Sequence, residues 1–335
     1  MPSSADRPSA AAVRRRLAFS LARVAVAAAI LILLARRIDL RASLEALRGA
    51  ASLPVVLALL LGFLAQLLVT LRLLVLARGQ ALASSFGRLL EINLSAVFYG
   101  LFLPGSNLAG TAVRFARIAR AERRSAATAV ALLADRMIAT ASLGAVGVLF
   151  WTIDRAPGSG SSAAFLALGT AALLLLLLPL FRPGIVEPLA RRLPARLPLL
   201  SRFREPLTAY GKLAPARIVA IAIPSLTAHL AGILAFVLLA RALGMEVSAL
   251  RLGWIRSLVV FSTMLPLTIA GFGVREATVV VLLGAAGVPE TTALAYSFLV
   301  FAVTVLPIGF AGGWLEARSA IASWLPVAAR KPPVA

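Results

Sequence analysis

The sequence contains no cysteine and a single histidine, His229. Disulfide bonds and Cys-ligated metal sites are therefore excluded, and one imidazole does not make a His-rich metal site. Charged residues are also scarce: they make up 14% of the 335 residues, whereas soluble proteins average about 25%. A soluble enzyme is thus excluded as a description of the whole chain, and the sequence predicts neither an enzyme nor a cofactor or metal site.

Hydrophobic residues make up 61% of the chain, and the net charge is +21. In a soluble protein such a positive charge would indicate nucleic acid binding. Here the arginines lie between long apolar runs, so the charge instead indicates membrane orientation and contact with anionic lipid. We therefore expect membrane lipids, anionic or phosphate-bearing, as partners and no nucleic acid.

Several apolar runs approach the length of about 20 residues that a helix needs to cross a bilayer. The predicted full spans are 17–34, 53–76, 126–152, 163–181, 217–240 and 291–314. The first run follows an arginine cluster, as a signal peptide does. Because it is long and ends in Ala35-Arg36-Arg37 rather than at a cleavage site, we interpret it as a retained helix.

Two regions are too short or too broken to cross. The run 92–103 stops at Leu103-Pro104-Gly105-Ser106-Asn107, and the run 257–270 is interrupted by Leu265-Pro266 and followed by a third short run, 277–288. Proline and glycine break helices, and a broken helix at membrane depth needs protein or a cavity around it. These regions are therefore predicted to be re-entrant broken-helix hairpins.

The distribution of arginine predicts the orientation. The basic segments 114–124 and 182–217 and the N-terminal arginines should be cytoplasmic. Residues 35–52 disagree, because they are basic yet fall outside by the count of spans. We expect a multi-pass protein of the cell (plasma or inner) membrane with both termini cytoplasmic. Its predicted parts are a basic N-terminus, 1–16, one polytopic membrane domain, 17–318, and a short C-terminal tail, 319–335.

The two broken regions resemble each other. One contains Leu103-Pro104, Ala109-Gly110 and Val113-Arg114, and the other contains Leu265-Pro266, Ala270-Gly271 and Val274-Arg275 at nearly equal spacing. They lie about half the chain apart, and the predicted path enters them from opposite faces. This pattern is typical of inverted-repeat transporters, in which broken helices meet near the midplane and form the substrate site.

The stretch from Phe98 to Arg114, the pair Asp135-Arg136 and the stretch from Leu265 to Glu276 resemble the flippase-like membrane domain of lysylphosphatidylglycerol synthases. The resemblance covers roughly residues 20–320. It implies an all-α polytopic fold with two re-entrant hairpins and a role in moving lipids or lipid-linked molecules between leaflets. The aminoacyltransferase domain of the full synthases is not found, so we do not expect the chain to make lysyl-lipid.

This sequence departs from the family pattern at two points. Ala109-Gly110-Thr111 stands where the family often has Gly-Gly-Asp before its arginine, and Asp135 stands where a glutamate is common. Because this acid is missing, a proton- or cation-coupled mechanism of the family is less readily carried over to this chain.

Charged residues within the apolar regions are the first candidates for a substrate site. Arg114 and Arg275 are predicted to clamp a lipid phosphate, because a guanidinium matches phosphate with two parallel donors. An interfacial anchor is the alternative for Arg114. Asp135 and Arg136 must face the interior with partners, either in the cavity or as a structural ion pair. Glu276 is expected to pair with an arginine other than Arg275, since adjacent residues on a helix do not face each other.

Small and polar residues at the breaks complete the predicted site. They allow tight turns or cap a half-helix, with close helix packing as the alternative. These residues are Gly105, Ser106, Asn107, Gly110, Gly271 and Gly273. His229 is expected to form an interhelical hydrogen bond rather than a proton relay, and Arg72 to extend to the interface from the end of its span.

Three functions compete at this stage. The leading one is a flippase or transporter of a lipid or lipid-linked substrate. A membrane-embedded enzyme acting on lipid phosphates is disfavoured, because the sequence offers no cluster of metal ligands. A non-transporting partner of a membrane-bound lipid synthase or glycosyltransferase is the remaining alternative.

Overall fold

The computed structural model describes residues 45, 47–102, 107–154, 164, 167–171, 203–210, 213–264 and 272–324. All regular secondary structure in this part of the chain is helical. The predicted span 17–34, most of 163–181 and most of the basic loop 182–217 lie outside the described residues. So do the connecting segments 103–106 and 265–271, which contain the Leu-Pro breaks.

The described helices fall into two series. In each, a long helix is followed by two shorter helices and then by a long helical stretch. The first series is α3 (Ser52–Gly79), α4 (Phe86–Phe102), α5 (Asn107–Glu122) and α6 (Ser125–Asp154). The second is α11 (Pro215–Ala242), α12 (Ala249–Met264), α13 (Val274–Gly284), α14 (Glu290–Thr304) and α15 (Leu306–Trp324), preceded by the short helix α10 (Arg204–Ala209). Each series thus places two shorter helices between longer helical stretches.

Among the described residues, four helical stretches are long and apolar enough to cross a membrane: α3, α6, α11 and the combined stretch Glu290–Ser319. They contain the predicted spans 53–76, 126–152, 217–240 and 291–314. The last of these is not one regular helix, because it is divided at Val305 between α14 and α15. Pro307 has no backbone N–H and its ring crowds the preceding turn, which explains the break.

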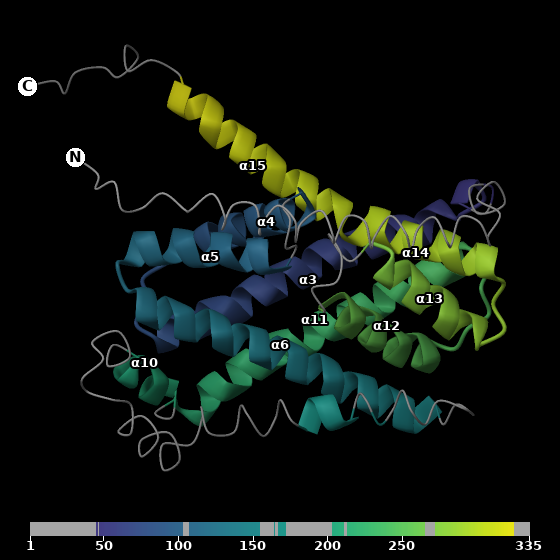
Figure 1. The fold of residues 1–335 in the computed structure, drawn as a ribbon, viewed down its shortest axis with the longest axis horizontal. Helices are drawn as coiled ribbons and strands as arrows, with labels where there is room; N and C mark the ends of the chain where they lie inside the picture. Colours follow the sequence, from purple (N-terminus) through teal and green to yellow (C-terminus); the bar gives the residue numbers. More distant parts are fainter. Residues whose placement is uncertain are drawn as a thin grey trace, which may run out of the picture.

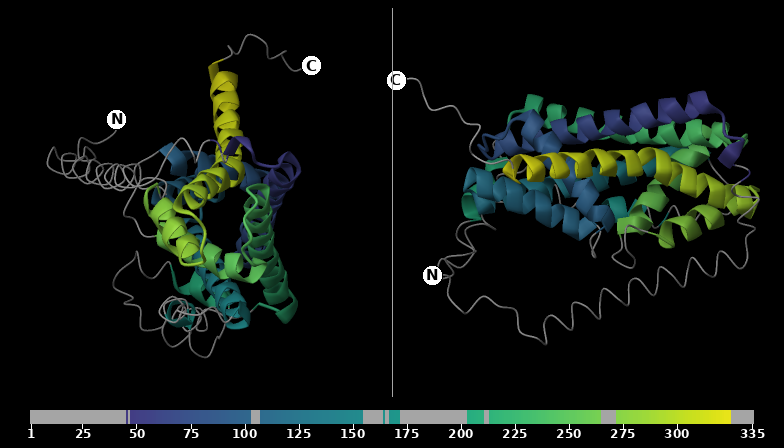
Figure 2. Two further views of the ribbon diagram at one scale, coloured as in Figure 1. Left: turned by 90° about the vertical axis from the view of Figure 1, so that its right-hand side faces the viewer. Right: turned by 90° about the horizontal axis from the view of Figure 1, so that it is seen from above.

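The shorter helix pairs lie at opposite ends of the long axis, with α4 and α5 at one end and α12 and α13 at the other (Figure 1). Figure 2 shows that the long helices run roughly along this axis and are arranged around it. At each end, a hydrogen bond connects the residues next to the start or the end of two helices. Glu122 accepts from the Ala83 N–H at 2.8 Å at the α5–α6 end, and the Ala51 N–H donates to Ala242 at 3.0 Å at the α11–α12 end.

The two series are interlocked. Helix α3 packs along α11, whereas α4 packs on α15 and α12 packs on α6. Each first short helix therefore contacts the last long stretch of the other series. Glycines permit these contacts: a Cβ on Gly312 of α15 would lie 2.1 Å from the Leu94 carbonyl oxygen of α4, and a Cβ on Gly253 of α12 would lie 2.2 Å from the Phe150 ring of α6.

Gly312→Ala is expected to destabilise the protein by about 1–3 kcal/mol, because the added methyl group forces the α4 and α15 backbones apart. The matched control is Gly87→Ala on α4, where a Cβ would meet nothing within 4 Å. That change should be neutral or stabilising by about 0.5–1 kcal/mol. Unfolding of the purified variants in detergent measures both effects. Equal stability of the two variants would contradict the close approach of α4 and α15.

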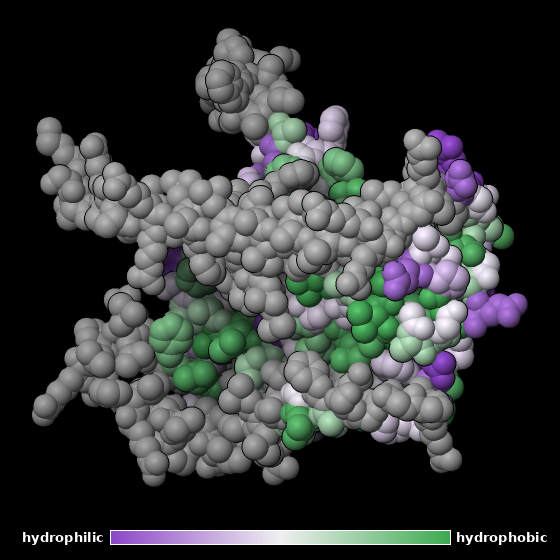
Figure 3. All heavy atoms as spheres, turned by 45° about the vertical axis from the view of Figure 1, so that its right-hand side comes forward, coloured by the Kyte–Doolittle hydropathy of each residue, from purple (hydrophilic) through white to green (hydrophobic). Residues whose placement is uncertain are grey.

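The outward faces of α3 and α11 are apolar. Exposed side chains there include Leu53, Leu57, Leu60, Leu64, Leu67, Ile218, Val219, Ile223, Leu230 and Leu234. Figure 3 draws another side of the molecule, where hydrophobic side chains also gather in the middle and hydrophilic ones lie toward the right-hand edge. Apolar surface of this extent is typical of contact with lipid hydrocarbon.

Candidate functional site

A cavity of about 450 Å³ lies where the broken ends of the shorter helices come together. The end of α4, the start of α5, the end of α12 and the start of α13 all contribute to its wall, together with α3, α6, α11, α14 and α15. Its polar lining residues are Gln66, Thr111, Arg114, Arg136, His229, Arg256, Thr263, Arg275 and Thr304. We call it the arginine cavity after Arg114, Arg136, Arg256 and Arg275.

Helix termini add to the positive character of the cavity. Helices α5 and α13 begin beside it, at Asn107 and Val274. The first turn of a helix carries unpaired N–H groups and a partial positive charge. The fixed charges and the backbone dipole at the start of α5 therefore favour an anion, whereas the carboxylate of Glu276 already caps the first turn of α13.

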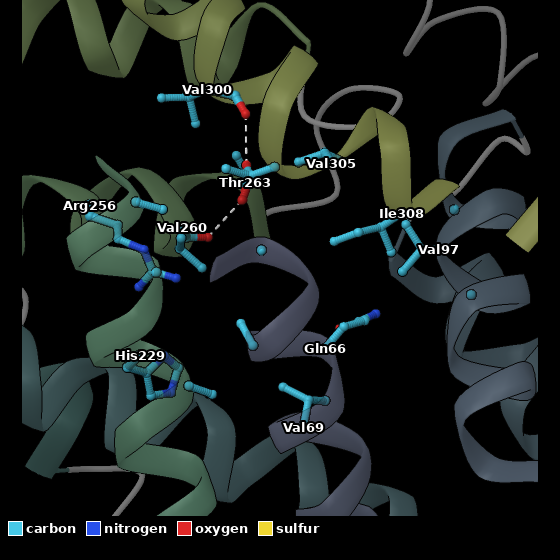
Figure 4. A pocket seen from close by; sticks show the side chains of 18 of the residues that line it. Gln66, Val69, Val97, His229, Arg256, Val260, Thr263, Val300, Val305 and Ile308 are labelled. Atoms are coloured by element: carbon cyan, nitrogen blue, oxygen red, sulfur yellow. Dashed lines mark hydrogen bonds between the residues drawn. The ribbon is translucent and has the colours of Figure 1, made fainter. Parts of the chain in front are cut away.

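Arg256 was not among the residues predicted from the sequence. Its side chain extends from α12 into the open centre, above His229 of α11 (Figure 4). Its guanidinium stacks over the Phe236 ring with 5.6 Å between the guanidinium carbon and the ring centroid. Its Nη1 is buried without a hydrogen-bond partner. A buried donor without an acceptor is costly, which makes this nitrogen a strong candidate for contact with a ligand.

Gly232 of α11 makes room for this guanidinium. A Cβ at position 232 would lie 2.2 Å from Arg256 Nη2 and 2.6 Å from its central carbon. Any larger side chain would displace the guanidinium, so the glycine has a positioning role.

Asp135 is buried, as predicted, but its main partner is Arg72 of α3. Arg72 Nε donates to Asp135 Oδ1 at 2.8 Å, and Arg72 Nη1 donates to the Ser225 hydroxyl of α11 at 3.0 Å. The prediction that Arg72 extends to the interface is wrong, because its side chain is 2% exposed. This ion pair joins α3, α6 and α11 behind the cavity wall.

Arg114 lies between this ion pair and the cavity. Its Nη1 is 4.0 Å from Asp135 Oδ2, while its Nε is buried without a hydrogen-bond partner. It shares Asp135 with Arg72, so its charge is only partly compensated. The structure therefore places Arg114 in the cavity wall rather than at the end of the helix.

Arg136 differs from its neighbour Asp135. It lines the cavity, which is one of the two alternatives predicted for it. The expectation of burial with a partner is wrong, because its side chain is exposed and no carboxylate of the described residues lies within ion-pairing distance. The two residues are adjacent on α6, and their side chains leave the helix in different directions. Asp135 turns toward Arg72, whereas Arg136 adds an unpaired cation to the cavity.

Arg275 and Glu276 form an ion pair, which corrects the expectation that Glu276 pairs with another arginine. Arg275 Nε donates to Glu276 Oε1 at 3.1 Å. The pair forms because Glu276 lies in the first turn of α13 and folds back to accept the Gly273 N–H at 2.7 Å, a capping interaction. Gly273 has φ 83°, a left-handed conformation that favours glycine.

Two aromatic rings fix the position of the Arg275 guanidinium. The centroids of the Phe272 and Phe301 rings lie 5.3 Å and 4.3 Å from its central carbon. Cation–π contact, ion pairing and 7% exposure together hold this arginine in one place at the cavity wall.

The other predicted residues at the breaks have different outcomes. A Cβ on Gly110 would lie 2.6 Å from the Ala96 carbonyl oxygen, so this glycine allows α4 and α5 to pack closely while it lines the cavity. Gly105, Ser106 and Gly271 lie outside the described residues. Asn107 begins α5, but its side chain is also outside the described part.

His229 makes the interhelical contact predicted for it: its Nε2 lies 3.0 Å from the Ala139 carbonyl oxygen of α6. This contact fixes the imidazole at the cavity wall. Within the described ranges, no three His, Asp or Glu side chains lie together as ligands of a metal ion would.

Two polar clusters lie away from the cavity. In one, Glu316 of α15 accepts from Arg117 Nη2 of α5 at 2.7 Å and from the Tyr99 hydroxyl of α4 at 3.0 Å. In the other, Asp154 of α6 accepts from Arg251 Nε at 3.2 Å and from Trp254 Nε1 at 3.0 Å, both on α12. Each cluster fastens a shorter helix to the last long stretch of the other series.

The part of the chain that the structure describes is helical, contains four apolar spans and encloses a cationic cavity, which together define an integral membrane protein. The family model of the lysylphosphatidylglycerol synthase TM region matches residues 20–312. Because this match covers most of the sequence, the chain belongs to that family, whose members correspond to the non-catalytic membrane part of the synthases. A comparison with curated proteins found no match.

Proposed function

We propose that the protein moves a phosphate-bearing lipid headgroup between the two leaflets of the membrane, with the arginine cavity as its binding site. The observation that carries this proposal is the convergence of Arg114, Arg136, Arg256 and Arg275 on one cavity. They come from four different helices, two in each series. Unpaired guanidinium nitrogens remain on Arg114 and Arg256.

The chemistry of the cavity suits this task. A phosphate that enters hydrocarbon loses its hydration, which is prohibitive unless hydrogen bonds and opposite charge replace the water. Guanidinium groups keep their charge when desolvated and offer paired donors to phosphate oxygens. The headgroup can thus cross through the cavity while its acyl chains stay in the hydrocarbon.

The proposal includes two re-entrant hairpins, formed by α4 with α5 and by α12 with α13. In support, each pair is short, is interrupted by a Leu-Pro sequence, and lies at its own end of the long axis. Broken backbone at membrane depth is tolerated where it lines a cavity, and both pairs line this one. The order of helices in the two series supports an inverted repeat.

The charges at the two ends support a cytoplasmic location for the α5–α6 end. Its described arginines include Arg78, Arg88, Arg120, Arg123, Arg124 and Arg217. At the α11–α12 end only Arg48, Arg241 and Arg251 are found among the described residues. Lys and Arg concentrate on the cytoplasmic side of membrane proteins, so both chain termini are proposed to be cytoplasmic in the cell membrane.

Single cysteines test this orientation, because the chain contains none of its own. Ala83→Cys at the α5–α6 end should resist an impermeant maleimide in intact cells and react after permeabilisation. Glu246→Cys at the α11–α12 end should react in intact cells. Both side chains are exposed, so reactivity reports sidedness. The reverse pattern would invert the proposed orientation.

Leaflet exchange in proteoliposomes tests the function itself. Purified protein should accelerate the loss of a labelled phospholipid from one leaflet, measured by dithionite quenching of its fluorophore. Empty vesicles and heat-inactivated protein give the background. A well-folded protein that binds phospholipid without exchanging it would favour the alternative of a non-transporting partner for a membrane-bound synthase or glycosyltransferase.

A further inference from the structure

We propose that the arginine cavity prefers a headgroup with more than one negative charge and no ammonium group, namely a phosphate monoester or a diphosphate. This inference rests on the proposed function, because it specifies the substrate class of the same site. It follows from which arginines around the cavity have a carboxylate partner and which have none.

The positive charge of the cavity exceeds its compensation by more than one unit. Arg275 is balanced by Glu276, and Asp135 is shared between Arg72 and Arg114. Arg136 and Arg256 have no carboxylate within ion-pairing distance among the described residues. A phosphodiester brings one negative charge, whereas a phosphate monoester brings about 1.5–2 at neutral pH. The monoester therefore matches the two uncompensated arginines better.

An ammonium group would find no anionic partner. The cavity lining contains no aspartate or glutamate in the described part of the chain. The two acids nearest the wall, Asp135 and Glu276, already pair with arginines. A headgroup with an ammonium would meet like charges, and such repulsion is an effective means of excluding a ligand.

Competition binding with lipids of identical acyl chains tests the preference. The probes are phosphatidic acid as the monoester, phosphatidylglycerol as the diester and lysylphosphatidylglycerol as the ammonium-bearing headgroup, each displacing a fluorescent phosphatidic acid from the purified protein. We expect phosphatidic acid to bind about tenfold or more tightly than phosphatidylglycerol, since its second negative charge allows one further charge-assisted contact with an arginine. Lysylphosphatidylglycerol should bind most weakly.

Variants connect the preference to the two unpaired arginines. Arg136→Gln and Arg256→Gln should each reduce the ratio of monoester to diester affinity by about tenfold. Arg241→Gln, at the exposed end of α11, removes the same charge outside the cavity and should leave the ratio unchanged. Inorganic diphosphate as competitor separates the sources: displacement of the lipid at similar concentrations would show that the site recognises the free anion.

The outcomes separate the two proposals. Equal affinity for phosphatidic acid and phosphatidylglycerol, or tight binding of lysylphosphatidylglycerol, would overturn the charge preference even if lipids are exchanged. The expected order of affinities without exchange of any of these lipids in proteoliposomes would support the preference and overturn transport.

Discussion

Replacing Arg256 with alanine is expected to lower lipid exchange at least tenfold while leaving the stability of the protein unchanged or increased. Its guanidinium has a buried, unpaired Nη1, and no acid of the described residues lies within ion-pairing distance of it. Removing such a charge relieves a desolvation cost instead of breaking a pair. It also removes a donor to the phosphate, and lost charge-assisted contacts of about 1.5–3 kcal/mol correspond to roughly tenfold or more.

The measurement combines exchange in proteoliposomes with thermal unfolding of the same preparation. Arg241→Ala is the matched control and should retain both exchange and stability. Full exchange by Arg256→Ala would remove this residue from the site. Arg275 is less suited to this test, because its removal leaves Glu276, which is 0% exposed, without its cation. Loss of exchange in Arg275→Ala would then have a structural and a functional cause.

Replacing Asp135 with alanine is expected to destabilise the protein by about 3–5 kcal/mol, the cost of breaking one side of a buried ion pair. Arg72 would remain 2% exposed with Ser225 as its hydrogen-bond acceptor, and Arg114 would lose its nearest carboxylate. Poor expression and a lowered melting temperature in detergent should result.

A double-mutant cycle controls this interpretation. Arg72→Met combined with Asp135→Leu removes both charges and should recover much of the loss, because apolar replacement of a whole buried pair is often neutral or stabilising. A coupling energy near zero between positions 72 and 135 would contradict the pairing seen in the structure.

The fold was largely readable from the sequence because apolar length and helix breakers act locally. The spans 53–76, 126–152, 217–240 and 291–314 were found by hydropathy, and the Leu-Pro sequences correctly separated α4 from α5 and α12 from α13. The division of the last stretch at Val305 was missed, although Pro307 signals it. The predicted spans 17–34 and 163–181 stay predictions.

Pairing in space was less predictable, because it depends on contacts between distant helices. Arg72 lies close to the end of an apolar run, and nothing nearby in sequence indicates Asp135 as its partner, 63 positions away. Adjacent residues inside a helix do not face each other, and this predicts a different partner for Glu276 than Arg275. The prediction fails because Glu276 lies in the first turn of α13 and folds back to cap it. Arg256 stands immediately before the apolar run 257–270 and not inside it, so charge within an apolar run does not indicate it. An isolated arginine within one turn of such a run is the sequence signal for a residue of this kind.

The crossed packing of the two series has a consequence for biosynthesis. Tyr99 of α4 meets Glu316 of α15, a residue 217 positions later. Helix α4 is thus synthesised long before α15, the helix that covers it. Until α15 is made, the surface of α4 around Leu94 and Ser95 lacks its packing partner. The late closure of so long a loop makes assembly slow and dependent on the whole polypeptide. A polypeptide that has not yet been extended to α15 therefore leaves the surface of α4 around Leu94, Ser95 and Tyr99 without its covering helix.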